Sequence, residues 1–147
     1  MALPPAHADP HLGGRRLSLV DVPGHERFVR TMIAGASGID MFLLVVAADD
    51  GPMPQTLEHL AVLRALGVDR GVIALTKVDL VDPETRAIAA ADAAALAPSA
   101  PLVEVSSRTG EGIEELRAAL ARVAEEVSGD VNPSLSEAPK RRSSGWR

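Results

Sequence analysis

The chain has 147 residues and no cysteine, so its length suits one domain and excludes disulfides and thiolate metal sites. Apolar residues make up 46% of the chain, and the formal charge of −5 argues against a broad basic face that binds nucleic acid. The longest apolar run, Ile39 to Ala48, contains Asp40 and is too short to span a bilayer. We therefore expect no membrane association, and the absence of cysteine suits a cytoplasmic location.

The first predicted elements lie between residues 1 and 47. Residues 1–14 contain three prolines and a Gly-Gly pair, which predicts an irregular segment that is not a signal peptide. A short strand over 17–20 leads into a turn at Asp21. Apolar residues at helical spacing predict a helix over 26–36. The continuous apolar run 41–47 is typical of a parallel strand buried on both faces.

From residue 54 onward, predicted helices alternate with predicted strands. Proline at the first helical position marks the start of two helices, a glycine ends the first, and Asp82 is the expected N-cap of the second. The predicted elements are a helix over 54–66, a strand over 71–75, a helix over 83–96, a strand over 102–105 and a helix over 113–127. Parallel βαβ units follow from this alternation, so the expected fold class is α/β with a doubly wound, mainly parallel sheet.

The pattern of apolar residues stops at Ser128. The residues after it include two prolines, several serines and the basic cluster Lys140 to Arg142, a composition typical of disorder. The predicted organisation is an irregular segment over 1–14, one α/β domain over 15–127 and a disordered tail over 128–147.

Asp21-Val22-Pro23-Gly24 follows the first predicted strand and is the first candidate for chemistry. A carboxylate at a strand end can hold the water shell of Mg²⁺, and a glycine lets the backbone approach a phosphate. His25, just past the glycine, can orient a water for attack on a phosphoryl group. The alternatives stay open at this point, because Asp-x-x-Gly turns are common and a lone histidine is more often a surface residue.

Two further motifs follow later strands. In Thr76-Lys77-Val78-Asp79, the aspartate can accept hydrogen bonds from N1–H and the exocyclic amine of guanine, which adenine cannot donate together, while the lysine stem can cover the base. The backbone of Ser106-Ser107-Arg108 can contact the guanine carbonyl. The alternatives are a charged turn at a strand end and an ordinary serine-rich loop.

The positions of the three motifs strengthen one another. Each lies just past the C-terminal end of a predicted strand, on the sheet edge where doubly wound folds bind ligands. Their order predicts a nucleotide site with its phosphate end at Asp21 and its base end at Asp79.

Taken together, the motifs resemble the GTPase domain of translation elongation factors. Asp21 to His25, Gly51 to His59 and Thr76 to Asp79 carry the resemblance, which covers about residues 14–127. Within that family, Glu26 to Ala36 makes the chain look most similar to the selenocysteine-specific elongation factors.

The resemblance implies GTP and Mg²⁺ as cofactors. Asp21 would serve Mg²⁺, Gly24 the γ-phosphate, and His25 would act in catalysis on the attacking water. The residues implied to hold or flank guanine are Thr76, Lys77, Asp79, Ser106, Ser107 and Arg108. The implied partners are GTP and GDP, the ribosome, selenocysteinyl-tRNA and an insertion-element RNA hairpin.

The chain departs from the family pattern in its phosphate-binding part. The 147 residues contain no Gly-x-x-x-x-Gly-Lys-Ser/Thr loop, no first strand before it and no RNA-binding domains. The expected function is that of a fragment of a GTPase domain, truncated at both ends, whose GTP binding is impaired. The alternative is an inactive remnant that acts, if at all, as a non-enzymatic partner-binding protein, so enzymatic activity is left open between the two.

Overall fold

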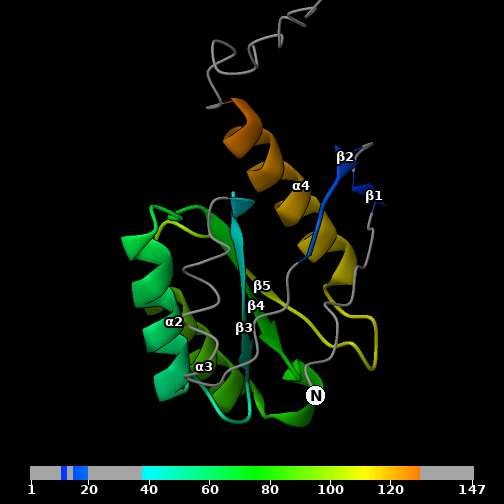
Figure 1. Cartoon of the computed structure of the whole chain (residues 1–147). Helices are drawn as coiled ribbons and strands as arrows, with labels where there is room; N and C mark the ends of the chain where they lie inside the picture. The colour runs from blue at the N-terminus through cyan, green and yellow to red at the C-terminus, as the bar shows by residue number, and fades with distance from the viewer. Residues whose placement is uncertain (1–10, 13–14, 20–37, 130–147) are drawn as a thin grey trace, which may run out of the picture.

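The computed structural model describes residues 11–12, 15–19 and 38–129 (Figure 1). The elements, in chain order, are β1 (His11–Leu12), β2 (Arg15–Arg16), β3 (Phe42–Ala47), α2 (Pro54–Ala65), β4 (Gly71–Thr76), the 3-10 helix η3 (Val78–Leu80), α3 (Pro83–Leu96), β5 (Leu102–Glu104) and α4 (Ile113–Gly129). No helix in these described ranges is long and apolar enough to cross a membrane.

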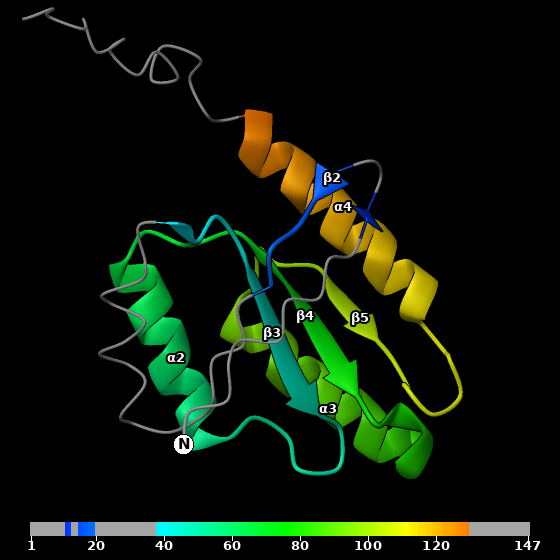
Figure 2. The ribbon, with the colours of Figure 1, turned by 45° about the vertical axis from the view of Figure 1, so that its right-hand side comes forward.

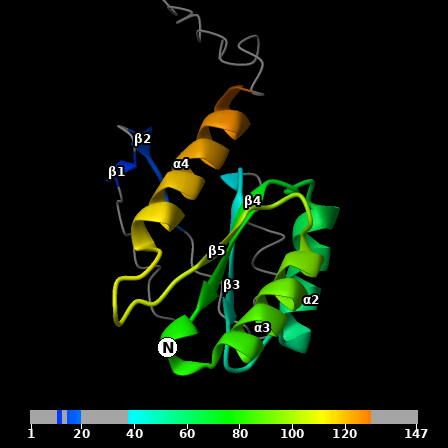
Figure 3. The same cartoon turned by 180° about the vertical axis from the view of Figure 1, so that it is seen from behind.

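A parallel sheet with the order β3-β4-β5 forms the centre of the fold. Its register pairs Leu44 with Ile73 and Ile73 with Leu102. Helices α2 and α3 lie on one face of this sheet and α4 lies on the other, as the view in Figure 1 and the view from behind in Figure 3 agree. The predicted α/β class with parallel βαβ units is therefore confirmed.

The boundaries of α2 and α3 follow from local sequence signals. Pro54 and Pro83 each take the first helical position, where the missing N–H leaves no bond unmade. The Asp82 carboxylate accepts hydrogen bonds from the backbone N–H groups of Glu84 and Thr85, both at 3.0 Å, as predicted for an N-cap. Gly67 has a φ of +76°, which lets the chain leave α2 in a left-handed conformation.

Strand β4 lies at the centre of the core. Ile73 and Leu75 are fully buried in the cluster shared with α2 and α3, and Val72 is fully buried against Ala119 and Val123 of α4. Because both apolar clusters of the described residues include side chains of this strand, β4 holds the following loop, at Lys77, in a fixed place.

Strand β3 differs from its prediction as a strand buried on both faces. Val45 is 57% exposed. It shares a face with Leu43, and the cluster on that face, formed by Val72 of β4 with Ala119 and Val123 of α4, has Leu43 and Met41 packed against it but not Val45. The prediction was wrong at this residue because β3 is the outer strand of the three and lies beyond the cover that α4 provides.

The N-terminal region also differs from its prediction. Residues 17–19 are described and form no strand, since none of the described strands pairs with them. A short antiparallel pair, β1 with β2, lies instead within the expected irregular region and just after it, and β1 contacts α4. Val20, the predicted helix over 26–36 and residues 130–147 lie outside the described residues.

Candidate functional site

Three loops leave the parallel strands at the same edge of the sheet, where their carboxyl ends meet (Figure 2). Backbone hydrogen bonds join neighbouring exits. The N–H of Ala48 donates to the carbonyl of Thr76 at 2.8 Å, and the N–H of Val78 donates to the carbonyl of Val105 at 3.5 Å. The second and third predicted motifs are thereby brought side by side.

Thr76 is the last residue of β4 and is half-buried. Its hydroxyl donates to the carbonyl of Val46 at 3.4 Å, and its own carbonyl accepts from Ala48. Both groups of Thr76 therefore tie β4 to the end of β3. This places Thr76 beneath the loops as a support for the residues that follow it.

Lys77 takes a left-handed backbone conformation, with φ of 59°. This conformation is uncommon for a residue with a side chain and is worth attention near a site. The ammonium group lies 3.1 Å from Oδ2 and 3.3 Å from Oδ1 of Asp49, at the exit of β3. The hydrogen bond to Asp49 raises the pKa of Lys77 and holds its ammonium at the exit of β3.

Asp79 projects its carboxylate into the region between the β4 and β5 exits. Its side chain is only 12% exposed, and Arg108 Nε lies 3.3 Å from its Oδ2. A hydrogen bond from the Ser106 hydroxyl is the largest cause that lowers the pKa of Asp79, and the charge of Arg108 adds to it. Within the described residues, Oδ2 has no hydrogen-bond partner, so this buried oxygen can still accept one.

Ser106 organises the loop after β5. It is fully buried, its hydroxyl oxygen accepts from the backbone N–H of Thr109 at 3.2 Å, and its carbonyl accepts from Gly110 at 2.9 Å. Its own N–H donates to the carbonyl of Glu111 at 2.9 Å. Ser107 and Arg108 stand exposed on this turn. The predicted Ser-Ser-Arg segment therefore lies beside Asp79.

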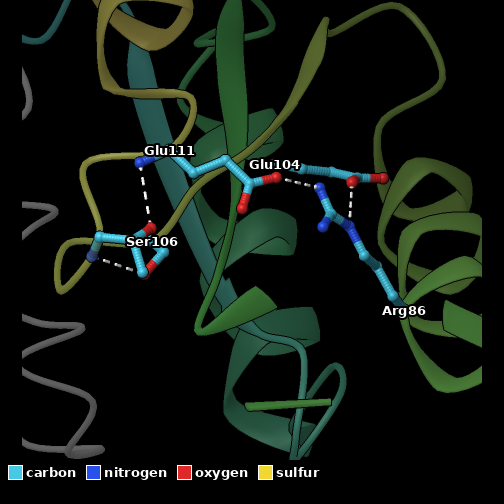
Figure 4. Close-up of polar contacts among 5 residues, drawn as sticks. Arg86, Glu104, Ser106 and Glu111 are labelled. Atoms are coloured by element: carbon cyan, nitrogen blue, oxygen red, sulfur yellow. Dashed lines mark hydrogen bonds and ion pairs between the residues drawn. The ribbon is translucent and has the colours of Figure 1, made fainter. Parts of the chain in front are cut away.

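Arg86 of α3 supports the same loop and was not anticipated from the sequence. Its guanidinium donates to Glu104 at the end of β5 and, from Nη2 at 2.8 Å, to Oε1 of Glu111 (Figure 4). The hydrogen bonds to Glu111 and then to Glu104 raise the pKa of Arg86. The two glutamates stand on either side of Ser106 in the sequence, so a single cation fixes both ends of the turn.

The phosphate end of the predicted site lies outside the described residues, since Asp21, Gly24 and His25 are not among them. In the ranges that are described, no group of three or more histidine, aspartate or glutamate side chains could hold a metal ion. The predicted roles of these three residues stay predictions.

A hollow of about 690 Å³ lies at the opposite edge of the sheet. Its lining includes Asp69 and Arg70, which precede β4, the segment 98–101, which precedes β5, and Arg122 of α4. It therefore shares no residue with the three loops at the carboxyl ends of the strands. The chemistry of the candidate site is at those loops, where the buried acceptor of Asp79 lies.

Both fold and site define a class of protein. A parallel α/β domain with a polar site at the carboxyl ends of its strands is the arrangement of nucleotide-binding domains. Here that site offers a shielded carboxylate beside an aliphatic lysine stem, which suits a planar base with N–H donors at its edge.

The chain belongs to the elongation factor Tu GTP binding domain family, which it matches over residues 6–126. It is 43% identical over 129 residues to a selenocysteine-specific elongation factor of Desulfomicrobium baculatum, an alignment covering 84% of this chain and 20% of that protein.

Two solved structures resemble the fold. The crystal structure of a bacterial selenocysteine-specific elongation factor, EF-Sec, has a TM-score of 0.69 and 41% identity, covering 76% of this chain and 20% of that one. The elongation factor SelB from Methanococcus maripaludis, in complex with the GTP analogue GppNHp, has a TM-score of 0.65 and 26% identity, covering 80% and 26%. The chain thus spans a fifth to a quarter of the length of these proteins.

Proposed function

We propose that the chain is part of the GTPase domain of a selenocysteine-specific elongation factor, and that its strand-exit loops hold the guanine base of GTP or GDP. The observation that carries this proposal is the Asp79 carboxylate, which is shielded from solvent and whose buried Oδ2 is ion-paired with Arg108 but receives no hydrogen bond from the described residues. Membership of the GTP-binding family supports the same ligand.

In this proposal Asp79 accepts from N1–H and the exocyclic amine of guanine. Its lowered pKa keeps it ionised, and therefore an acceptor, throughout the neutral range. Lys77 lays its stem along the base while Asp49 holds its ammonium, and Thr76 fixes the strand end below. Adenine offers no N1–H donor and leaves the carboxylate unsatisfied, which is the physical basis of discrimination.

The phosphate chemistry in this proposal belongs to the residues before β3. Asp21 serves Mg²⁺, Gly24 donates to the γ-phosphate and His25 orients the attacking water. Hydrolysis is coupled to delivery of selenocysteinyl-tRNA to the ribosome in response to an insertion-element RNA. These roles rest on the family and on the position of the Asp21 motif in the sequence.

We also propose that these 147 residues alone bind GTP weakly. They contain no Gly-x-x-x-x-Gly-Lys-Ser/Thr segment, which supplies backbone N–H groups and an ammonium to the β- and γ-phosphates. Losing several charge-assisted hydrogen bonds weakens binding by at least several powers of ten, at roughly 1.5–3 kcal/mol each. A micromolar dissociation constant for GTP by calorimetry would contradict this.

The test of the base site is a nitrogen-15 NMR titration of the chain with GDP, ADP and xanthosine diphosphate. We expect the wild type to favour GDP over ADP by about tenfold or more. Asp79→Asn replaces one acceptor by an N–H donor, which matches the C2 carbonyl of xanthine. We therefore expect the preference to move from GDP to xanthosine diphosphate in this variant.

The matched control is Asp69→Asn, which removes one carboxylate at the opposite edge of the sheet. We expect it to keep the preference of the wild type for GDP. Equal binding of all three nucleotides by wild type and Asp79→Asn would refute the base site and would favour a partner-binding remnant.

A further inference from the structure

The ion pair between Asp79 and Arg108 joins a largely buried side chain to an exposed one. Asp79 is 12% exposed, while Arg108 is 78% exposed and lies over it from the turn after β5. The distance from Nε to Oδ2 is 3.3 Å, yet Oδ2 has no hydrogen-bond partner in the described part of the chain. The contact is therefore an attraction of charges without a directed hydrogen bond.

The backbone that carries Arg108 is fixed, although its side chain is free to move. Ser106 accepts from Thr109 and Gly110 across the turn, and Arg86 binds Glu104 and Glu111 at its two ends. The hydrogen-bonded turn therefore keeps the guanidinium of Arg108 within reach of the Asp79 carboxylate. Its high exposure leaves room for it to swing into solvent.

Arg108 and guanine offer the same chemistry to Asp79. A guanidinium and the N1–C2–N2 edge of guanine are both planar and both present neighbouring N–H donors, and carboxylates bind such groups side by side. A base whose two N–H donors span both oxygens of Asp79 would place one donor at Oδ2, where Arg108 Nε already lies 3.3 Å away. A base that donates to Oδ2 has to move the guanidinium aside.

We propose that Arg108 covers Asp79 in the empty site as an internal substitute for guanine, and that the base must displace it to bind. The inference rests on the proposed function and adds regulation to the same site. When no ligand is present, the ion pair compensates the charge of the buried carboxylate. Because the pair must break before a base binds, it weakens base binding by the free energy of the pair. If Arg108 instead helped to hold the base by stacking on it, removing its side chain would weaken binding, which is the opposite sign.

The test compares Arg108→Ala with Arg122→Ala, which removes an equal charge from α4 at the opposite edge of the sheet. The probe is guanosine, since a neutral nucleoside does not respond to the loss of a cation through phosphate attraction. Binding is followed by nitrogen-15 NMR. We expect Arg108→Ala to bind guanosine about two- to fivefold more tightly than the wild type, the range expected for an exposed ion pair. Arg122→Ala should leave the affinity unchanged.

Each outcome decides a separate question. If Arg108→Ala binds guanosine as tightly as the wild type or more weakly, while the wild type prefers guanosine to adenosine, Arg108 does not cover Asp79 as proposed. The proposed function still stands in that case. No nucleoside binding by any variant refutes the proposed function and, with it, the displacement. Carbon-13 NMR of the Asp79 carboxyl then shows whether the pair exists, because its pKa should rise in Arg108→Ala and stay unchanged in Arg122→Ala.

Discussion

Single residues at the strand exits contribute both to folding and to the candidate site. Lys77 leaves β4 with a positive φ, which is uncommon for a residue with a side chain, and its ammonium pairs with Asp49 at the exit of β3. Asp82 ends the same loop by capping α3 through Glu84 and Thr85. The loop that carries Asp79 is therefore anchored by a charged side chain at either end.

The cap at Asp82 makes a prediction about pH. Hydrogen bonds from Thr85 lower the pKa of Asp82 below its ordinary value of 3.8. A group whose pKa is lower in the folded state stabilises the fold above its unfolded pKa and loses that contribution as the pH falls through the folded one. We expect Asp82→Asn, which still caps but cannot titrate, to match the wild type near pH 7 and to lose less stability below about pH 4.

Urea unfolding at a series of pH values measures this effect. Asp82→Ala is the companion variant, because it loses the cap at every pH and should be less stable than Asp82→Asn near neutrality. If wild type and Asp82→Asn lost stability in parallel down to pH 2, the carboxylate would contribute nothing through its titration.

At the scale of elements, the turn between β5 and α4 has the tightest steric requirement among the described glycine positions. Gly110 and Gly112 both have positive φ, of +83° and +73°. A Cβ on Gly110 would meet nothing within 4 Å, whereas a Cβ on Gly112 would collide with the carbonyl oxygen of Glu104. A side chain at Gly110 therefore costs only the free energy of the backbone conformation. A side chain at Gly112 costs that free energy and also the free energy of the steric clash.

We expect Gly110→Ala to lower the free energy of unfolding by about 1–2 kcal/mol, through its backbone conformation alone. Gly112→Ala should lower it by about 3 kcal/mol or more, because the turn must also move away from β5. Urea unfolding of the two variants checks the difference. Equal losses would mean that the turn shifts freely and that its position beside Asp79 is not fixed by β5.

The ends of helices could be predicted wherever the residues at the end itself determine it. Pro54, Gly67, Asp82 and Pro83 mark helix ends through their own backbone chemistry, and the structure places those ends within a residue or two of the prediction. Arg86 could not be found in this way, since its partners Glu104 and Glu111 lie 18 and 25 residues away in the sequence. The exposure of Val45 likewise depends on where α4 ends its cover, which only the packed molecule determines.

The site was predictable to the same extent and for the same reason. The order of the motifs placed Lys77, Asp79 and Ser106 at one edge of the sheet, because parallel strands bring their carboxyl ends together. The ion pairs of Asp49 with Lys77 and of Arg108 with Asp79 join different loops and leave no local pattern in the sequence. Asp21, Gly24 and His25 lie outside the described residues, and their placement stays a prediction.

At the scale of the whole molecule, stability is concentrated on β4. Its residue Leu75 is fully buried between the sheet and the layer of α2 and α3, while Leu57 on α2 is 57% exposed. The same chemical change at the two leucines should therefore have very different effects.

We expect Leu75→Ala to lower the free energy of unfolding by about 2–5 kcal/mol, from lost burial and the cavity that remains. Leu57→Ala should change it by no more than about 0.5 kcal/mol. Urea unfolding followed by circular dichroism measures both. Comparable losses would indicate that Leu57 is covered in solution and that the core extends beyond the one described here.

The order of the turn that Arg86 holds bears on the rates at which a ligand would associate and dissociate. Because its atoms are already ordered, the conformational entropy of the turn is lost when the chain folds and not when a base arrives. A ligand meeting such a surface associates at a rate set by encounter and orientation, and differences between ligands emerge in how long each one stays. If the loops hold a base as proposed, loosening the turn at Arg86 should shorten the residence time of that base.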